Sequence, residues 1–499
     1  MNDVAAQKIT DIETSSAGRE LDGSLVHGLA WTAGVKWAAQ GLSWFSTLLV
    51  ARLLSPDDYG LVGMATVYLG MVTLLTEFGV GTTIVTLREL DEIHIAQLNG
   101  FAVLLGLAGF ALSCIAAVPL GHFFHSSRLP LVVIAMSATF IIASFQSVPA
   151  ALLQRDLRFK LLSLVDGTKV MVVSAVMVIL AWLGFHYWTL VIGSLLSTLT
   201  ATLLILSRRT HRLSWPRFRE IRHATRFSWH ILVSRISWYA YSNSDFVVCG
   251  RVLGQQVLGA YSIAWNLANI PVEKTTGVLN SVTPALFSAV QKDNASIRRY
   301  LLNLTEVIAL VTLPLSVGLG LVARDFVLVV LGPRWEPAIA PLQLLALYVS
   351  VRSITPLIPI VLNSVGESRF NMWNNLVAAV VLPAAFYMGS RSGSRGIAAA
   401  WLVAYPLVAF PLYFRAFQKI ELPWTTYVGC LRAAIIGTLA MVLAVVSLAR
   451  LISDSTHAQR LAVQVLAGGA AYILAAGWMN YQRRGALLKI FRLLRSTKS

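Results

Sequence analysis

Long apolar stretches alternate with short polar ones along almost the whole chain. A helix needs roughly 20 apolar residues to cross a hydrocarbon core about 30 Å thick. Fourteen stretches reach that length, and each predicts one transmembrane helix. The predicted spans are residues 29–54, 59–86, 98–120, 129–151, 164–184, 186–206, 227–251, 256–286, 300–323, 338–363, 370–390, 395–414, 427–449 and 460–481.

The composition agrees with a membrane protein. Of the 499 residues 56% are hydrophobic and 13% are charged, whereas soluble domains carry charge on roughly a quarter of their residues. Cys114, Cys249 and Cys430 lie inside apolar stretches without paired or ligand-like spacing, which is typical of packing residues. The sequence therefore predicts an all-α polytopic membrane protein.

The positive charges are distributed unevenly between alternate loops. If the amino terminus is cytoplasmic, 25 of the 40 Lys and Arg residues lie in cytoplasmic segments, 9 in external loops and 6 within spans. This bias predicts that both termini are cytoplasmic. Residues 1–28 are polar and lack the apolar core of a cleavable signal peptide. The net charge of +17 is therefore explained by membrane topology, and no nucleic-acid partner is expected.

The longest cytoplasmic connection, residues 207–226, separates two halves that resemble each other. At a shift of 199 residues, ARLLSPDDYGLVGMA from Ala51 aligns with GRVLGQQVLGAYSIA from Gly250, so that Gly60 meets Gly259. Each copy holds six spans and begins with an outward-running helix. The repeats are therefore parallel and related by a pseudo-two-fold axis along the membrane normal.

The repeat predicts the division of the chain into two six-helix lobes followed by two extra helices. The expected parts are a flexible cytoplasmic amino terminus (1–28), an N-lobe (29–206), a basic cytoplasmic linker (207–226), a C-lobe (227–420), two extra helices (421–482) and a basic cytoplasmic tail (483–499).

Polar residues lie on one helix face in the first and eighth spans, the seventh span is too polar to be surrounded by lipid, and the second and tenth spans also carry polar or charged residues. An ionisable group costs about 2.5 to 3.5 kcal/mol at the centre of a membrane helix, so such groups usually face a bundle interior. We expect the first, second, seventh and eighth spans to line a central pathway, with a contribution from the tenth. The substrate-pathway candidates are Lys36, Gln40, Arg235, Tyr239, Asn266, Asn269, Lys274 and Arg352, and the ion-coupling candidates are Glu77, Asp245 and Glu273.

Several of these residues have a plainer interpretation. Lys36 and Arg235 are near enough to the cytoplasmic edge for their charges to reach the headgroups. Glu77 and Glu273 would also suit buried networks that fix helix packing. Arg352 lies near the middle of its span, too deep for easy snorkelling, which favours a cavity-facing or paired position.

The sequence contains no motif that would make the chain an enzyme. It has no nucleotide-binding glycine loop, no metal-ligand helix motif and no nucleophile elbow. Its predicted external loops are short. We therefore expect neither catalysis nor a metal or cofactor.

Several segments together indicate a family. They are ARLLSPDDYGLVGMA from Ala51, TEFGVGTTIV from Thr76, ALLQRDLRF from Ala151, GRVLGQQVLGAYSIA from Gly250, TPALFSAVQKD from Thr283 and LGPRWEPAIAPLQLLAL from Leu331. They resemble the polysaccharide-transporter branch of the multidrug, oligosaccharidyl-lipid and polysaccharide exporter superfamily. Within it, the chain is most similar to Wzx-type flippases of the colanic acid, teichuronic acid and xanthan kind.

The resemblance implies two lobes around a central cavity in the bacterial cytoplasmic membrane. It implies export of an undecaprenyl-diphosphate-linked repeat unit by alternating access, energised by an ion gradient. Membrane lipid and polysaccharide polymerase or export proteins are the implied partners. The alternatives left open are a drug or cation antiporter of the same superfamily, a membrane enzyme of glycan assembly, and a non-transporting scaffold.

Overall fold

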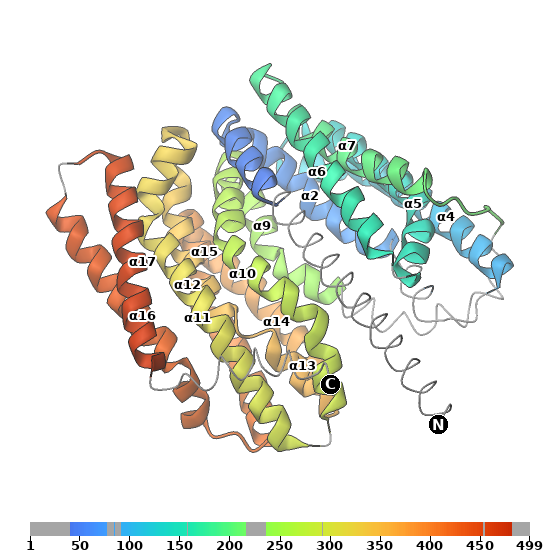
Figure 1. Ribbon diagram of the computed structural model, residues 1–499. Coiled ribbons are helices and arrows are strands. Elements are labelled where there is room, and N and C mark those ends of the chain that lie inside the picture. The colour runs from blue at the N-terminus through green and yellow to red at the C-terminus, as the bar shows by residue number, and fades with distance from the viewer. Residues whose placement is uncertain are drawn as a thin grey trace, which may run out of the picture. The chain divides into compact units, whose positions relative to one another are not determined.

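The computed structural model describes residues 40–76, 84, 91–156, 158–215, 236–291, 293–452 and 455–481. These residues form helices and turns, with no strand among them. They divide into two compact units, and each unit combines separate stretches of the chain. Figure 1 shows the helices coloured by position in the chain.

The first unit contains residues 1–54, 68–120 and 128–232. Its described helices are residues 40–53, the second half of α2 (Pro56–Thr76), most of α4 (Glu92–Phe124), and α5 (Leu129–Arg155), α6 (Phe159–Trp182) and α7 (Trp188–Leu206). Helix α7 packs against α5 and α6. Close approach depends on small residues, because a Cβ on Gly106 of α4 would lie 2.7 Å from the Phe140 carbonyl oxygen of α5.

The second unit contains residues 55–67, 121–127 and 233–499. Its longest helices, α10 and α11, continue without interruption for 35 and 33 residues. The described elements are α9 (Ser244–Val248), the π-helix η1 (Cys249–Leu253), α10 (Gln255–Ala289), α11 (Asn294–Phe326), the π-helix η2 (Val327–Leu331), the 3₁₀ helix η3 (Pro333–Ala338), α12 (Ile339–Arg352), α13 (Leu357–Ser364), α14 (Ser368–Gly389), the 3₁₀ helix η4 (Ser390–Ser392), α15 (Gly393–Lys419), α16 (Trp424–Leu451) and α17 (His457–Tyr481).

The predicted spans correspond to helices wherever the structure describes them. Within the described residues, ten stretches are long and apolar enough to cross a membrane. One of them, Ser368–Lys419, contains two predicted spans, which are α14 and α15. The tenth span differs from the prediction. It is interrupted at residues 353–356, between α12 and α13. Pro356 lies at this break, where proline suits the start of a new helix because it has no backbone N–H to donate.

The start of α2 shows how local sequence begins a helix. Ser55 precedes the helix, and its backbone nitrogen and hydroxyl donate to Asp58 Oδ2 at 2.9 and 2.7 Å. The Asp58 backbone nitrogen lies 3.3 Å from Ser55 Oγ. This is a reciprocal cap, and Pro56 occupies the first helical position, where proline is favoured.

The repeat predicted from sequence appears as a symmetric contact inside the second unit. A Cβ on Gly60 of α2 would lie 1.9 Å from the Gln255 carbonyl oxygen, and a Cβ on Gly259 of α10 would lie 1.7 Å from the Pro56 carbonyl oxygen. Pro56 and Gln255 are themselves partners at the shift of 199 residues. The starts of α2 and α10 therefore meet backbone to backbone at equivalent positions of the repeat. We call this contact the glycine seam.

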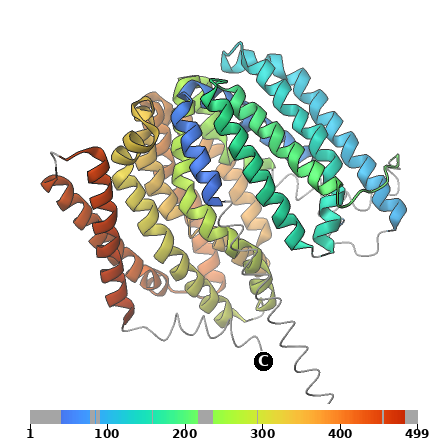
Figure 2. The same cartoon turned by 45° about the horizontal axis from the view of Figure 1, so that its top comes forward.

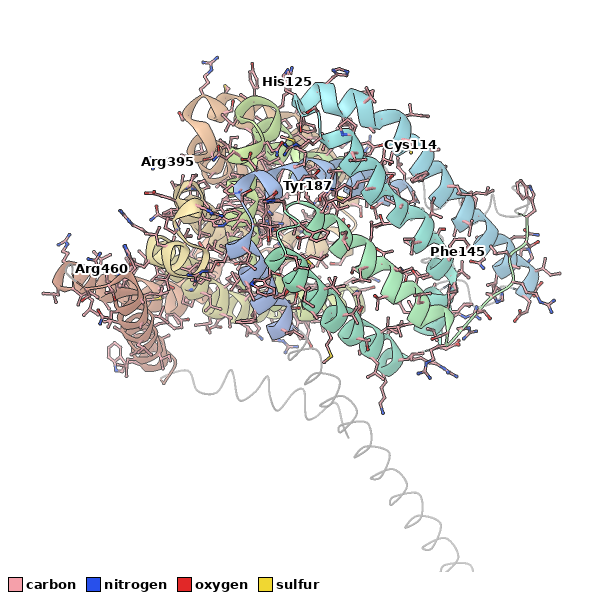
Figure 3. All side chains as sticks on the ribbon, turned by 90° about the horizontal axis from the view of Figure 1, so that it is seen from above. Cys114, His125, Phe145, Tyr187, Arg395 and Arg460 are labelled. Atoms are coloured by element: carbon pink, nitrogen blue, oxygen red, sulfur yellow. The ribbon has the colours of Figure 1, made fainter. Side chains whose placement is uncertain are left out.

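Further contacts surround the glycine seam. The Gln255 side chain donates to the Asp57 carbonyl oxygen at 2.9 Å, and the Tyr59 ring meets the buried Trp335 ring edge-on at 5.4 Å. At the end of α4, His125 (Figure 3) lies 2.7 Å from Arg251 Nη1. The seam is thus one part of a packed end of this unit.

Helices α16 and α17, which follow the repeat, pack against each other and against α11 (Figures 1 and 2). Tyr472 of α17 donates to the Leu310 carbonyl oxygen at 2.6 Å. His457 Nδ1 lies 2.6 Å from Asp325 Oδ1. One hydrophobic core cluster, which includes the buried Ile308, contains residues of α11, α13, α15 and α16. The two extra helices are therefore an integral part of the second unit.

The three cysteines are free. Cys114 (Figure 3) is partly exposed, whereas Cys249 and Cys430 are buried. The sequence prediction that the chain divides at residues 207–226 stays a prediction.

Candidate substrate pocket

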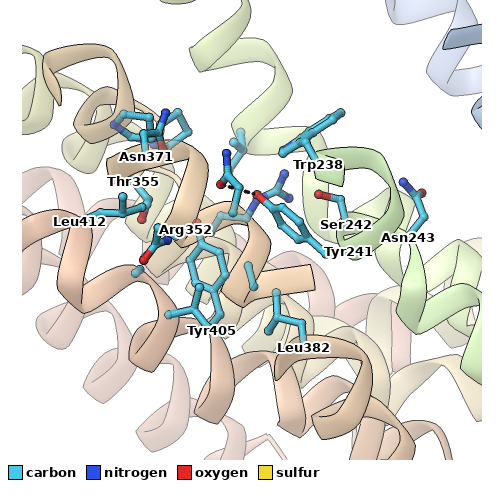
Figure 4. A pocket seen from close by; sticks show the side chains of 18 of the residues that line it. Trp238, Tyr241, Ser242, Asn243, Arg352, Thr355, Asn371, Leu382, Tyr405 and Leu412 are labelled. Carbon is cyan, nitrogen blue, oxygen red and sulfur yellow. Dashed lines mark hydrogen bonds between the residues drawn. The ribbon is translucent and has the colours of Figure 1, made fainter. Parts of the chain in front are cut away.

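A pocket of about 520 Å³ lies wholly within the second unit. Helical residues 236–242 and helices α10, α12, α14 and α15 contribute to its wall, together with the break between α12 and α13 (Figure 4). The lining residues include Trp238, Tyr241, Ser242, Asn243, Trp265, Asn269, Arg352, Thr355, Pro356, Pro359, Asn371, Asn374, Asn375 and Tyr405.

Arg352 carries the only charge among the lining residues that the structure describes. It is the last residue of α12, a position where the helix dipole favours a cation. Its Nη1 donates to Asn269 Oδ1 at 3.0 Å, and its guanidinium lies 5.8 Å from the centre of the Trp265 ring. None of the ion pairs within the described part of the chain includes Arg352.

Three asparagines from the first turns of α14 supply amides to the pocket. Asn371, Asn374 and Asn375 follow a spacing of three and four residues, which places them on one face of the helix. Asn374 is buried, and the Tyr241 hydroxyl lies 3.5 Å from Asn375 Oδ1. Each amide can both donate and accept a hydrogen bond.

Aromatic rings also line the pocket. Trp265 and Tyr405 line it, and both contact a deeper pair, Tyr348 and Trp401. The Tyr348 and Trp401 rings are stacked with their centres 4.8 Å apart. We call these four residues the aromatic cluster.

Asp245 lies behind the aromatic cluster and is fully buried. Its Oδ2 accepts hydrogen bonds from the Tyr261 hydroxyl at 2.8 Å and from Trp401 Nε1 at 2.9 Å. Its Oδ1 has no hydrogen-bond partner among the described residues. The carboxylate is thus connected to the pocket through Trp401.

The structure brings together some of the residues predicted from sequence. Asn269 and Arg352 meet in the pocket, and Asp245 lies one aromatic layer away. Tyr239 instead donates to the Val67 carbonyl oxygen of α2 at 3.1 Å. Asn266 is exposed on α10 and does not line the pocket, and Gln40 lies in the helix of residues 40–53 in the first unit.

The other predicted site residues lie outside what the structure describes. Lys36, Glu77 and Arg235 are outside the described residues. Glu273 and Lys274 belong to α10, and their side chains are not described. No group of three His, Cys, Asp or Glu side chains suited to a metal ion occurs in the described ranges.

Sequence reasoning missed the asparagines of α14 and the aromatic rings. The run NMWNN from Asn371 was a usable signal, because three amides within five residues are unusual in a membrane span. Neutral amides lack the charge that marks Arg352 and Asp245 within their spans.

The comparison with family models decides the identification. The model described as polysaccharide biosynthesis protein matches residues 49–340, which is more than half of the chain. The chain belongs to the polysaccharide biosynthesis protein family. The family expected from the sequence segments is thereby confirmed.

Three relatives of similar length extend this finding. The lipopolysaccharide biosynthesis protein WzxC of Escherichia coli (strain K12) is 23% identical over 397 residues, which are 78% of this chain and 80% of WzxC. The succinoglycan biosynthesis transport protein ExoT of Rhizobium meliloti (strain 1021) is 25% identical and covers 90% of both chains. The teichuronic acid biosynthesis protein TuaB of Bacillus subtilis (strain 168) is 24% identical, covering 84% of this chain and 88% of TuaB.

Solved structures confirm the expected all-α transporter fold. The lipid II flippase MurJ in an inward closed conformation superposes with a TM-score of 0.68 at 13% identity, over 91% of this chain and 99% of MurJ. An inward-facing multidrug resistance MATE family transporter of the MOP superfamily gives 0.63 at 15% identity, over 77% and 94%. This polysaccharide biosynthesis family member is therefore a multi-pass membrane protein with the fold of these transporters.

Proposed function

We propose that the chain is a flippase that moves an undecaprenyl-diphosphate-linked oligosaccharide across the bacterial cytoplasmic membrane by alternating access. The observation that carries the proposal is the pocket of about 520 Å³ within the membrane-embedded second unit, lined by Arg352, amides and aromatic rings. Such a lining replaces the water that a polar headgroup loses on entering the membrane. The similarity to WzxC, ExoT and TuaB, which are named for lipopolysaccharide, succinoglycan and teichuronic acid biosynthesis, supports a glycan cargo.

In this mechanism both termini are cytoplasmic, so α2 and α10 begin at the outer face of the membrane. The glycine seam then closes that face, because the starts of the two helices touch backbone to backbone at Gly60 and Gly259. Release of cargo to the outside requires this contact to part. Small residues permit such contacts without interlocking side chains.

Asp245 is our proposed coupling group, with Glu77 and Glu273 as further candidates. Trp401 donates to the buried carboxylate and packs on Trp265 and Tyr405 of the pocket wall. A movement of the wall would therefore change the hydrogen bond to Asp245. Proton uptake at Asp245 Oδ1, which has no described partner, would neutralise the buried charge while the pocket opens outward. Lys36, Gln40, Arg235, Tyr239, Asn266 and Lys274 remain proposed pathway residues.

A strain lacking the chain tests the proposal. We expect surface polymer to disappear and complete lipid-linked oligosaccharide to accumulate, and the wild-type gene to reverse both changes. An assembly enzyme would instead leave incomplete oligosaccharide, and an antiporter would leave polymer intact and change drug susceptibility. A scaffold that acts on the polymerase or export proteins would leave complete oligosaccharide in the outer leaflet.

A further inference from the structure

Helix α4 ends with a histidine in a position that usually belongs to glycine. The Ser126 backbone nitrogen donates to the Gly121 carbonyl oxygen at 3.0 Å, and the His125 backbone nitrogen donates to the His122 carbonyl oxygen at 3.3 Å. These two bonds form a Schellman motif, in which His125 is the left-handed residue with a φ of 54°. A side chain costs free energy in that conformation. We therefore expect the ring of His125 to have a role that offsets this cost.

The His125 ring contacts a cation. Arg251 Nη1 of η1 lies 2.7 Å from His125 Nε2, and the guanidinium lies 5.3 Å from the centre of the Phe123 ring. A guanidinium can only donate hydrogen bonds, so the imidazole accepts in this contact and is neutral. Histidine is the side chain whose charge ordinarily changes between pH 5 and 8. Protonation would turn this hydrogen bond into a contact between two cations.

The same corner of the molecule braces the glycine seam. We call residues 121–127 the α4 corner, and Figure 3 shows His125 there. Gln255, which begins α10 four residues after Arg251, accepts from the Ser126 hydroxyl at 3.3 Å and donates to the Asp57 carbonyl oxygen of α2 at 2.9 Å. The α4 corner therefore contacts the segment that leads into α10, and Gln255 extends this contact to the start of α2.

No carboxylate is paired with His125. None of the ion pairs within the described ranges includes it. His125 and Arg251 are both exposed, so protons from the solvent can reach the ring. Gln255 of α10 is neutral, and Asp58 of α2 accepts from Ser55. The titratable or charged side chains on the elements that meet here are Asp57, Asp58, Tyr59, His122 and Arg251.

We propose that His125 senses the pH outside the membrane, and that its protonation releases the α4 corner from Arg251 and favours opening of the glycine seam. The inference rests on the proposed function, which places this end of the second unit at the outer face. The sensor carries no proton across the membrane, because His125 returns its proton to the side from which it came. A gradient imposed by changing only the inside pH leaves the sensor unaffected, which separates it from Asp245.

The test follows the distance between the α4 corner and the start of α10 in the full-length protein in lipid nanodiscs. Pyrene labels on Ser127→Cys and Gln256→Cys, at two exposed positions, give excimer fluorescence only while these segments are close. Cys114, Cys249 and Cys430 are replaced by alanine in this background. We expect the ratio of closed to open protein to fall about fivefold between pH 7.5 and 5.5. Added salt is expected to weaken this response, because it screens exposed charges.

Two variants separate the proposed charge repulsion from packing. In His125→Asn the new residue tolerates the left-handed conformation, and its neutral carbonyl can accept from Arg251 at either pH. Arg251→Gln removes the other cation. Both variants are expected to lose the response to pH. His186→Asn is the matched control, because His186 is also left-handed, with a φ of 48°, but belongs to the first unit. It is expected to respond like the wild type.

Two results would overturn the assignment: an excimer signal in the wild type that is the same at both pH values, or a signal that still falls in His125→Asn or Arg251→Gln. The melting temperature at pH 7.5 checks that each variant is folded. Because the labels report on the contact without any cargo, failure of the sensor and failure of the flippase proposal are distinguishable. A deletion strain that accumulates lipid-linked oligosaccharide upholds the second whatever the labels show.

Discussion

At the scale of single residues, Asp245 is the buried group whose chemistry bears most on energy coupling. It is fully buried and holds two neutral donors, Tyr261 and Trp401, on one oxygen. An ionised carboxylate without a cationic partner is costly to bury, and protonation removes that cost. Such groups inside membrane spans often have a function. Its value to transport is therefore directly testable.

We predict that Asp245→Asn abolishes the stimulation of transport by an inward proton gradient, because an amide cannot take up the proton. Transport is followed in vesicles with and without an imposed gradient. Tyr261→Phe is the control, since it removes one donor and retains the carboxylate. It is expected to lower stability by about 1–3 kcal/mol and to remain gradient-dependent. An Asp245→Asn variant that responds to the gradient like the wild type would remove Asp245 from the coupling proposal.

The second prediction concerns the pH dependence of stability. It rests on Glu367, which lies between α13 and α14, outside the predicted membrane spans. Lys419 Nζ lies 2.7 Å and Arg415 Nη2 2.9 Å from Glu367 Oε1, and these hydrogen bonds lower the pKa of Glu367 from its ordinary value of 4.5. A lowered pKa means that the pair stabilises the folded state above pH 4.5 and that this contribution is lost as pH falls through the lowered pKa.

The measurement is the melting temperature as a function of pH. The wild type is expected to lose its advantage over Glu367→Gln as the solution becomes more acid, and added salt is expected to shrink the advantage at neutral pH. A constant difference between the two proteins across this range would show that the ion pair contributes nothing.

At this scale the sequence made Arg352 a pathway candidate because it lies deep in a span, and Asn269 because it lies on a polar stripe of the eighth span. It did not predict that they contact each other across α10 and α12. Asn374 was missed because neutral amides give no hydropathy penalty large enough to single them out. Which face of a span meets a pocket depends on packing that periodicity alone does not define.

At the scale of elements, the glycine seam is where sequence and structure agree most closely. The repeat aligns Gly60 with Gly259 and Pro56 with Gln255. In the structure Gly60 lies against the Gln255 carbonyl oxygen, and Gly259 lies against the Pro56 carbonyl oxygen. The interruption of the tenth span at Pro356 was harder to predict. Prolines are tolerated inside membrane helices when neighbours satisfy the freed backbone groups, so a proline alone does not indicate a break.

We predict that Gly60→Val and Gly259→Val each prevent the seam from closing, because a Cβ there would lie within 2 Å of a backbone oxygen. Each is expected to cost about 1–3 kcal/mol of stability and to reduce export. The double variant is expected to cost little more than either single one, since both open the same contact. Melting temperature and polymer export are the measurements.

Gly429→Val in α16 is the matched control, because nothing lies within 4 Å of a Cβ at that position. It is expected to behave like the wild type. Seam variants as stable and active as Gly429→Val would show that the contact between the starts of α2 and α10 has no role in the cycle.

At the scale of the whole molecule, hydropathy and charge were sufficient for the class of protein. Fourteen apolar stretches predicted the helices, and the structure confirms an all-α membrane fold. The composition of the two units was not predictable. Residues 55–67 and 121–127 belong to the second unit although they precede the predicted linker, because side-chain packing rather than chain order determines which segments form one unit.

The central claim is that this chain carries a lipid-linked oligosaccharide from one leaflet to the other. The most direct measurement uses proteoliposomes that contain the purified full-length protein and a radiolabelled undecaprenyl-diphosphate oligosaccharide, probed with a glycosidase that cannot cross the membrane. We predict that the protein makes the inner-leaflet pool accessible to the enzyme, and that Arg352→Gln, which removes the charge from the pocket, slows this. Accessibility limited to the outer-leaflet share, equal with and without protein, would contradict the account.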